Sequence, residues 1–241
     1  MNKGLFSAIW QLLFPPSCSG CGVRLPLDSS FALCRICRQE IIYLQPPFCR
    51  LCGCELIGDP ERSFCCGDCL RRPPPYHLAR SILRYEPCVG QLLQRLKYHG
   101  DTSVLPAMAE LIAGQDLSPF LNCQMIIPVP LHPGRHRQRG LNQATLLARL
   151  FFPERQADVN CNVLQRTRVT PAATSLNGER RRTNLRGAFG VSSGVELSGR
   201  VCLIDDVFTT GSTVAECAKT LLKHGVSEFR VLTLARADRP K

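Results

Sequence analysis

The sequence is poor in three features that would each decide the class of the protein. No apolar run in its 241 residues approaches the roughly 20 that a membrane-spanning helix needs. Acidic residues are scarce, since 19 Asp and Glu stand against 30 Lys and Arg, and the formal net charge is +11. Only 7% of the residues are aromatic, with a single tryptophan, so we interpret Trp10 as a packing residue and not as a base-stacking platform. These shortages exclude a transmembrane protein and favour polyanionic partners, either nucleic acid or phosphorylated small molecules.

The chain does have enough apolar residues for an ordered core, because 44% are hydrophobic and 20% are charged. Its length predicts one full α/β domain and a small additional module. Residues 4–14 run into Pro15 and Pro16 with no small-residue cleavage site, which is unlike a signal peptide. Their apolar residues recur at helical spacing, so we expect an amphipathic docking helix that allows peripheral contact with a membrane.

Cysteine is the residue that the sequence has in excess. Ten of the fifteen cysteines lie before residue 79, and eight of these ten form four C-x-x-C pairs. A two-residue spacer lets both sulfurs reach one ion from a tight turn, and two such turns complete a tetrahedral thiolate site for Zn²⁺. We therefore predict structural zinc on Cys18, Cys21, Cys34, Cys37, Cys49, Cys52, Cys66 and Cys69.

Several alternatives stay open for these cysteines. Sequential pairing, in which the first two C-x-x-C pairs share one ion and the last two share another, is the simpler topology, but interleaved pairing also fits the spacings. Cys65 could replace Cys66 as a ligand, and Cys54 is a further extra thiol. A disulfide-stapled extracellular domain is a weaker interpretation, since nothing indicates export to an oxidising compartment. We expect a reducing, cytoplasmic location.

The cysteine pattern also divides the chain. Residues 1–70 hold the N-terminal segment and a double zinc ribbon, in which metal ions replace a large hydrophobic core. Residues 71–76 begin Arg-Arg-Pro-Pro-Pro and form a stiff linker, because consecutive prolines favour an extended backbone. Residues 77–241 form the second, larger domain.

Strand-like and helix-like segments alternate along this larger domain. The run GRVCLIDDV is nearly continuous in apolar residues up to its two acids, which is typical of a parallel strand covered on both faces. The alternation predicts an α/β fold with a mostly parallel sheet flanked by helices. The expected strands are 79–85, 124–130, 199–207 and 228–235, and the expected helices are 89–100, 141–151 and 212–225.

The segment VCLIDDVFTTGST, residues 201–213, carries the clearest chemical signal. A hydrophobic strand ends in Asp205 and Asp206, and a hydroxyl-rich loop then opens a helix, whose N-terminal N–H groups can bind a phosphate. Paired acids would repel a bare phosphate, so they indicate a ligand that also has hydroxyls, or a divalent cation. Ribose 5-phosphate offers hydroxyls to the acids and a phosphate to the loop. The predicted loop residues are Thr209, Thr210, Gly211, Ser212 and Thr213.

This segment resembles the phosphoribosyl pyrophosphate (PRPP) motif of the type I phosphoribosyltransferases, in which two acids engage the ribose hydroxyls and the loop holds the 5-phosphate. The whole chain resembles the ComF family with its GntX-like DNA-utilisation proteins. Ala173 is a departure, because members of the family usually have glutamine there. The resemblance is carried by LFPPSCSGC, CRLCGC, CGDC, LKYHGD (96–101), IPVPLHPGRHRQRGLNQA (127–144), RTRVTPAATSL with RRTNLRGAF (166–189) and VLTLAR (231–236).

The resemblance implies a fold, ligands and partners. The fold is a type I phosphoribosyltransferase-like domain that binds PRPP with Mg²⁺ and is preceded by a double zinc ribbon. ComF-like proteins are linked to natural competence and to the handling of incoming DNA, so the implied partners are single-stranded DNA and other proteins of DNA uptake. No residue stands out as a general base, so either the acceptor supplies its own nucleophile or PRPP is bound without turnover. The loop on the diphosphate side corresponds to Pro128, Val129, Pro130, Leu131 and His132.

Arginine supplies most of the excess positive charge. Residues 135–186 hold eleven arginines and no lysine against three acids. The planar guanidinium favours bidentate recognition of phosphate, so we predict a nucleic-acid-binding strip, with a solvated positive surface as the alternative. The predicted strip consists of Arg135, Arg137, Arg139, Arg180, Arg181 and Arg182. The first three could also clamp the diphosphate of a ligand.

Two classes of function therefore stay open. The first is a PRPP-dependent phosphoribosyltransferase, or a PRPP-binding regulator, in the uptake or utilisation of DNA. The second is a single-stranded-DNA-binding adaptor whose sugar-phosphate pocket is a sensor or a relic. A nucleobase salvage enzyme is less favoured, because such enzymes have no need of a double zinc ribbon.

Overall fold

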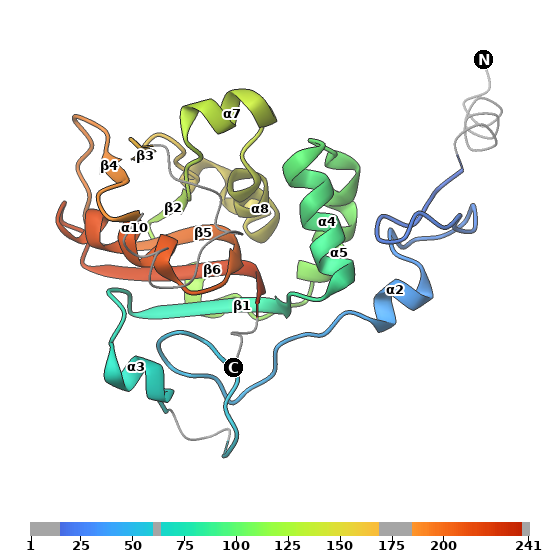
Figure 1. Cartoon of the computed structure of the whole chain (residues 1–241), viewed down its shortest axis with the longest axis horizontal. Helices are drawn as coiled ribbons and strands as arrows, with labels where there is room; N and C mark the ends of the chain where they lie inside the picture. Colours follow the sequence, from blue (N-terminus) through green and yellow to red (C-terminus); the bar gives the residue numbers. More distant parts are fainter. Residues whose placement is uncertain (1–14, 60–63, 169–184, 238–241) are drawn as a thin grey trace.

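A parallel four-stranded sheet forms the centre of the computed structural model of the chain (Figure 1). The structure describes residues 15–59, 64–168 and 185–237. The strand order is β1–β6–β5–β2, and every neighbouring pair is parallel, which confirms the predicted fold class. The four strands are β1 (Leu78–Arg84), β2 (Met125–Pro128), β5 (Arg200–Phe208) and β6 (Glu228–Arg236).

Helices cover both faces of this sheet. Side chains alternate along β5, so Cys202 and Ile204 belong to the core on one face, and Val201 and Leu203 to the core on the other. The first core includes the helices α4 (Pro87–Tyr98), α5 (Leu105–Ile112) and α8 (Gln143–Phe151). The second core includes α10 (Ser212–Leu222) and an antiparallel hairpin of β3 (Leu164–Arg166) and β4 (Phe189–Val191). Helices α4, α8 and α10 correspond to the three helices that the sequence predicts.

The sequence pattern does not predict the remaining helical segments. Helix α7 (Pro133–Arg139) lies within the arginine-rich stretch, and none of its described side chains is buried, so it lacks the apolar spacing that indicates a helix. It ends at Gly140, whose φ of 72° suits glycine. The others are α2 (Arg35–Gln39), α3 (Gly67–Arg71), α5, α6 (Ser118–Leu121), η1 (Thr102–Val104) and η2 (Pro153–Asp158).

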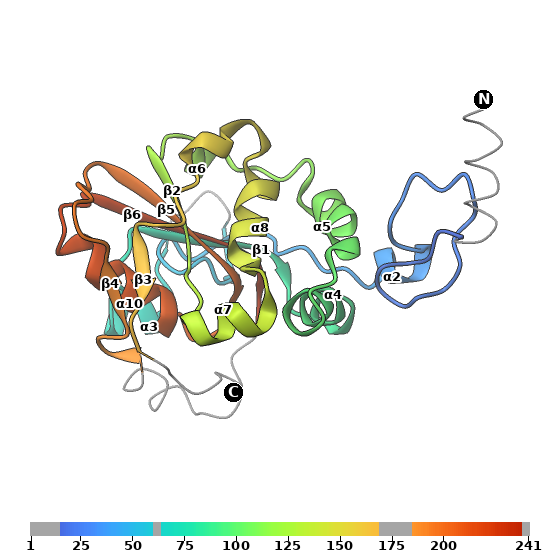
Figure 2. The same cartoon turned by 90° about the horizontal axis from the view of Figure 1, so that it is seen from above.

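The cysteine-rich part packs against both sides of the α/β part. Between its two halves, the N–H of Leu44 donates to the carbonyl of Ile82 in β1 at 2.9 Å. The first half contributes Leu25 and Leu33 to the core of α4 and α5, and the second contributes Cys49 to the core of α10. Figure 2 shows the first half, with α2, beyond α4 and α5 at one end of the molecule. The boundaries at residues 70 and 76 stay predictions.

No helix among the described residues is long and apolar enough to cross a membrane. Residues 4–14, for which we expect an amphipathic docking helix, lie outside the described residues. Peripheral contact of this segment with a membrane therefore stays a prediction.

Candidate functional site

The two acids and the hydroxyl-rich loop lie at the carboxyl end of β5, an inner strand of the sheet. Asp205 and Asp206 still belong to the strand, where Asp205 lies opposite Thr233 of β6. The chain then turns and enters α10 at Ser212, with Gly211 as the residue before the helix. The carboxyl end of a parallel strand followed by a helix N-terminus is where open α/β sheets bind their ligands. The structure therefore brings the predicted phosphate loop and the paired acids together at one edge of the sheet.

Hydroxyl groups and a glycine shape the loop. Oγ1 of Thr210 lies 2.8 Å from Oγ of Ser212 and accepts a hydrogen bond from the N–H of Ser212 at 3.4 Å. Gly211 has a φ of 73°, and a Cβ added there would lie 2.8 Å from Cζ of Phe208. Glycine is thus required by the backbone conformation and by the Phe208 ring.

A lysine from α4 holds one of the two acids. Nζ of Lys97 lies 2.6 Å from Oδ2 of Asp206, and the side chains are 24% and 14% exposed. Burial acts to lower the pKa of Lys97, but the negative charges of Asp206 and Asp205 outweigh it and hold this pKa above its usual value. Lys97 belongs to the LKYHGD segment, and no spacing pattern in the sequence connects it with an acid 109 positions later. It is a site residue that sequence reasoning missed.

The other acid, Asp205, lies in an environment that disfavours its ionised form. Oδ1 of Asp205 accepts a hydrogen bond from the N–H of Asp206 at 2.9 Å. Burial and the neighbouring charge of Asp206 raise the pKa of Asp205 to about 7, against the opposing effects of that hydrogen bond, Lys97 and Arg166. A carboxyl group held near neutrality in this way is typical of a functional site.

The raised pKa of Asp205 predicts a pH-dependent cost to stability. Between its ordinary pKa near 4 and its folded value of about 7, the unfolded chain releases the proton before the folded chain does. Stability contributed by the protonated group is therefore lost as the pH rises through about 7. We expect Asp205→Asn to raise the free energy of unfolding more at about pH 8 than at about pH 5.5, by roughly 2 kcal/mol, in urea denaturation.

Asp116→Asn is the matched control for this measurement. The hydrogen bonds from the side chain and backbone of Ser118 lower the pKa of Asp116, so its removal should not stabilise the protein as the pH rises. An Asp205→Asn variant with no pH-dependent gain would contradict the assignment.

The diphosphate-side loop follows β2, the neighbour of β5. The N–H of Val129 donates to the carbonyl of Ile204 at 2.8 Å, and the carbonyl of Val129 accepts from Nδ2 of Asn142 at 3.0 Å. Nδ1 of His132 accepts from the N–H of Gly134 at 3.1 Å and thereby caps α7. A cavity of about 700 Å³ lies beside this loop, with Pro130, Leu131, His132, His136 and Arg166 among its lining residues. The loop therefore stands at the same sheet edge as the paired acids.

The predicted arginine strip is described only in part. Arg137 is exposed on α7, and Arg135 is partly exposed on the same helix. Arg139 is engaged within the protein, since its guanidinium lies 5.2 Å from the ring centroid of Tyr98 and Nη1 lies 3.3 Å from Oε1 of Gln143. Arg180, Arg181 and Arg182 lie outside the described residues.

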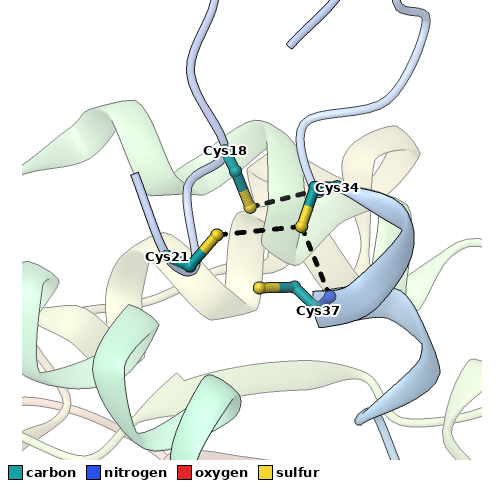
Figure 3. A group of neighbouring side chains, drawn as sticks. All are labelled: Cys18, Cys21, Cys34 and Cys37. Atoms are coloured by element: carbon teal, nitrogen blue, oxygen red, sulfur yellow. Dashed lines mark hydrogen bonds between the residues drawn. The ribbon is translucent and has the colours of Figure 1, made fainter. Parts of the chain in front are cut away.

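The first four predicted zinc ligands form one group, shown in Figure 3. Their sulfur atoms, from Cys18, Cys21, Cys34 and Cys37, lie within 4.8 Å of one another. The sulfurs of Cys21 and Cys34 are 3.7 Å apart, and four sulfurs bound tetrahedrally at about 2.3 Å from one Zn²⁺ would be about 3.8 Å apart. The N–H of Cys34 donates to the sulfur of Cys18 at 3.2 Å, as suits a thiolate. These residues fit a structural zinc ion.

The other four ligands form a second group in sequential pairing. The sulfurs of Cys49, Cys52, Cys66 and Cys69 lie within 4.8 Å of one another, and those of Cys52 and Cys66 are 3.7 Å apart. Cys65 does not belong to the group, because its sulfur accepts from Nε of Arg50 at 3.1 Å. The structure thus places Cys66 and not Cys65 among the ligands, and it groups the pairs without interleaving.

An arginine joins the second group to the phosphate loop. Nη1 of Arg236, at the end of β6, donates to the carbonyl of Cys52 at 2.7 Å, and Nη2 lies 3.7 Å from the Cys52 sulfur. The same guanidinium lies 4.6 Å from the ring centroid of Phe208, the residue that limits space at Gly211. Tyr76 packs edge-on against Phe208, with ring centroids 6.4 Å apart. The second zinc group and the loop therefore share one packed cluster.

Comparisons with known proteins agree with this architecture. The family model of the double zinc ribbon domain matches residues 9–70. The DNA utilization protein YhgH of Salmonella typhi is 31% identical over 231 residues, which are 94% of this chain and 99% of that protein. Competence protein F of Haemophilus influenzae is 36% identical over 212 residues, 85% of this chain and 90% of that protein. Competence protein ComFC of Streptococcus pneumoniae is 27% identical over 157 residues, 65% of this chain and 67% of that protein.

Proposed function

Because this chain belongs to the family of the DNA utilization proteins and competence protein F, we propose that it is a PRPP-binding, phosphoribosyltransferase-like protein that acts in the uptake or utilisation of DNA. The observation that carries the proposal is the edge of the sheet at β5. There the paired acids, the hydroxyl-rich loop and the N-terminus of α10 follow one another within nine residues, 205–213. A ribose 5-phosphate presents hydroxyls, which need acceptors, and then a phosphate, which needs N–H donors. The acids and the loop follow one another along the chain in the same order.

The neighbouring groups support a pyrophosphate-bearing sugar over a simple sugar phosphate. Val129 and His132 stand at the end of the adjacent strand, where the C1 substituent of a ribose held by Asp205 would extend. Asp206 is neutralised by Lys97, which lessens repulsion of an anionic ligand. We propose that Mg²⁺ accompanies the diphosphate, since carboxylates and phosphates are the ligands that this ion prefers. We assign no catalytic base, so the proposal concerns binding, with turnover as a separate question.

Calorimetric titration of the zinc-loaded protein with PRPP and MgCl₂ tests the proposal. We expect saturable binding that is weaker without Mg²⁺ and weaker still for ribose 5-phosphate, which has no diphosphate. Pyrophosphate release can then be sought with candidate acceptors. Absence of PRPP binding at millimolar ligand would contradict the proposal and favour an adaptor whose pocket is a relic.

Single-stranded DNA is the second proposed ligand, and α7 favours it. This helix presents Arg135 and Arg137 beside the loop that follows β2, and Figure 1 shows α7 above the sheet, beyond β2. Guanidinium groups on an outer helix can contact backbone phosphates without reading bases.

None of the fifteen cysteines, all of which are described, forms a disulfide, which fits a reducing compartment. We therefore propose a cytoplasmic location and contact with other proteins of DNA uptake there.

Salt dependence measures this DNA binding. If about five phosphates are neutralised, the slope of log K against log salt should be roughly −3.5 for a single strand. We expect Arg135→Gln with Arg137→Gln to flatten the slope by about 1.4, and the triple change of Arg180, Arg181 and Arg182 to Ala to flatten it further. Fluorescence anisotropy of a labelled oligothymidylate reports the slope, with Arg149→Gln on the exposed side of α8 as the control. Binding that ignores salt would count against the proposal.

A further inference from the structure

A cavity of about 680 Å³ lies on the outer side of the phosphate loop, between α10 and the second zinc group. One wall is formed by Thr210, Gly211 and Ser212 with the first two turns of α10. The opposite wall is formed by Cys52, Cys69 and the proline-rich segment 71–76. Asp205 and Asp206 do not line this cavity, whereas Thr210, Gly211 and Ser212 do. A phosphate on the loop would therefore border the cavity.

Tyr76 is the lining residue whose hydroxyl lies beside the phosphate loop. Its side chain is 6% exposed and packs against Phe208, yet its hydroxyl oxygen lies only 3.5 Å from the position of a Cβ on Gly211. Its hydroxyl makes no hydrogen bond with another described residue, and its oxygen is not fully buried, because Tyr76 lines the cavity. The hydroxyl is thus available to donate to an oxygen of a phosphate held at Thr210–Ser212.

Charge and size indicate what lies beyond that phosphate. The lining includes the cationic side chains of Arg71, Arg72 and Lys219 and the acidic side chains of Asp68 and Glu216. Asp68 is paired with Arg71 at 2.6 Å, and Glu216 lies 3.9 Å from Lys219, so one positive charge remains in excess. A bare phosphate fills only a small part of 680 Å³, whereas pockets for nucleotide-sized ligands occupy roughly 300–1,000 Å³. The phosphate of a ligand that fills this cavity must carry a second organic group on its outer side.

We propose that the cavity binds the penultimate nucleotide at the 3′ end of a single DNA strand, so that the phosphate on the loop is a phosphodiester. The terminal 3′-hydroxyl would then donate to the paired acids, Tyr76 would donate to the phosphodiester, and the preceding nucleoside would lie between α10 and segment 71–76. The inference rests on the proposed sugar-phosphate site. It adds that a strand end and PRPP occupy the same loop and exclude each other.

Small ligands test the proposal by calorimetry on the zinc-loaded full chain. The probes are thymidine 5′-monophosphate, the dinucleotide TpT, and TpT with a 3′-phosphate. We expect TpT to bind at least tenfold more tightly than the monophosphate, although it carries less charge, because only TpT reaches the cavity. The 3′-phosphate should weaken TpT by at least tenfold, since it meets two carboxylates. PRPP should displace TpT competitively.

Variants distinguish the contribution of the cavity to binding from that of the phosphate loop. Ala215 lines the cavity from α10, and Ala215→Phe would fill it while it leaves the loop backbone unchanged. We expect this variant to lose the advantage of TpT over the monophosphate and to keep PRPP binding. Tyr76→Phe should weaken TpT about tenfold, because it removes one hydrogen bond to a charged oxygen, whereas Tyr43→Phe on the far side of β1 should not.

The outcomes distinguish the two proposals. If PRPP binds but TpT is no tighter than the monophosphate, the cavity inference is wrong and the proposed function stands. If TpT shows its advantage and PRPP does not bind, the proposed PRPP function and the mutual exclusion are wrong, and the strand-end site stands. If Ala215→Phe keeps the advantage of TpT, the preceding nucleoside lies elsewhere and the inference fails.

Discussion

Replacement of both Asp205 and Asp206 by asparagine is expected to weaken PRPP binding by at least roughly a hundredfold. At about pH 8, above the raised pKa of Asp205, each change keeps the shape of the side chain but removes its charge and one acceptor position. A hydrogen bond to a charged group contributes about 1.5–3 kcal/mol, and two such losses exceed the roughly 2.7 kcal/mol that a hundredfold change requires. Calorimetry with PRPP and MgCl₂ gives the ratio directly, and Asp116→Asn, which lies outside the site, should bind as the parent does.

The single variants Asp205→Asn and Asp206→Asn should differ in stability, because Lys97 pairs with Asp206. Asp206→Asn leaves the mostly buried ammonium of Lys97 without its partner at 2.6 Å, so this variant should also lose stability. Asp205→Asn has no such cost, so it should lose affinity without losing stability. The double variant Lys97→Met with Asp206→Asn should recover stability but not PRPP affinity. Equal affinity in parent and Asp205/Asp206 double variant would show that the acids do not contact the ribose.

Removal of single cysteines is expected to produce the largest effects on folding. We expect two zinc ions per chain in the parent, one in Cys66→Ala, and two in Cys65→Ala, which is the neighbouring control. Structural zinc contributes about 10–16 kcal/mol in isolated zinc-finger peptides, as much as the whole stability of an ordinary domain. Cys66→Ala should therefore unfold the second half of the cysteine-rich part, while Cys65→Ala should unfold at nearly the parent's denaturant concentration.

Elemental analysis and urea denaturation make this comparison. A Cys65→Ala protein that loses an ion, or a Cys66→Ala protein that keeps two, would contradict the ligand assignment. The two groups should also differ in what they disturb. The first contacts α4, where Arg95 donates to the carbonyl of Ser19, whereas the second contacts β6 through Arg236. Only loss of the second ion should reduce PRPP affinity.

Local patterns in the sequence predicted which residue types form the site, but they predicted less well which residues contact one another there. The C-x-x-C pairs are predictable because a two-residue spacer is itself the geometry that a zinc ligand pair needs. The strand before Asp205 is predictable because a strand buried on both faces must be apolar throughout. Adjacent thiols are different: the C-x-x-C spacing to Cys69 favours Cys66, but it does not exclude Cys65, and the grouping of the sulfurs and the contact of Cys65 with Arg50 decide between them.

The missed features are those that depend on contacts between distant segments. Lys97 meets Asp206, and Arg236 meets Cys52, across more than a hundred residues, so no periodicity reports either pair. Tyr76 reads as the end of a proline-rich linker, yet the fold buries it beside Gly211. Helix α7 carries no apolar stripe, so its helical state depends on Pro133, the His132 cap and Gly140.

The contact of Arg236 with both Cys52 and Phe208 has a thermodynamic consequence for metal retention. Coupling between two binding sites is reciprocal, so whatever factor the second zinc ion adds to the affinity of the loop, a ligand on the loop adds to the affinity for zinc. When zinc is scarce, copies of the protein that hold ligand would keep this ion, and empty copies would lose it first. Occupancy of the loop would then decide which molecules survive a shortage of metal.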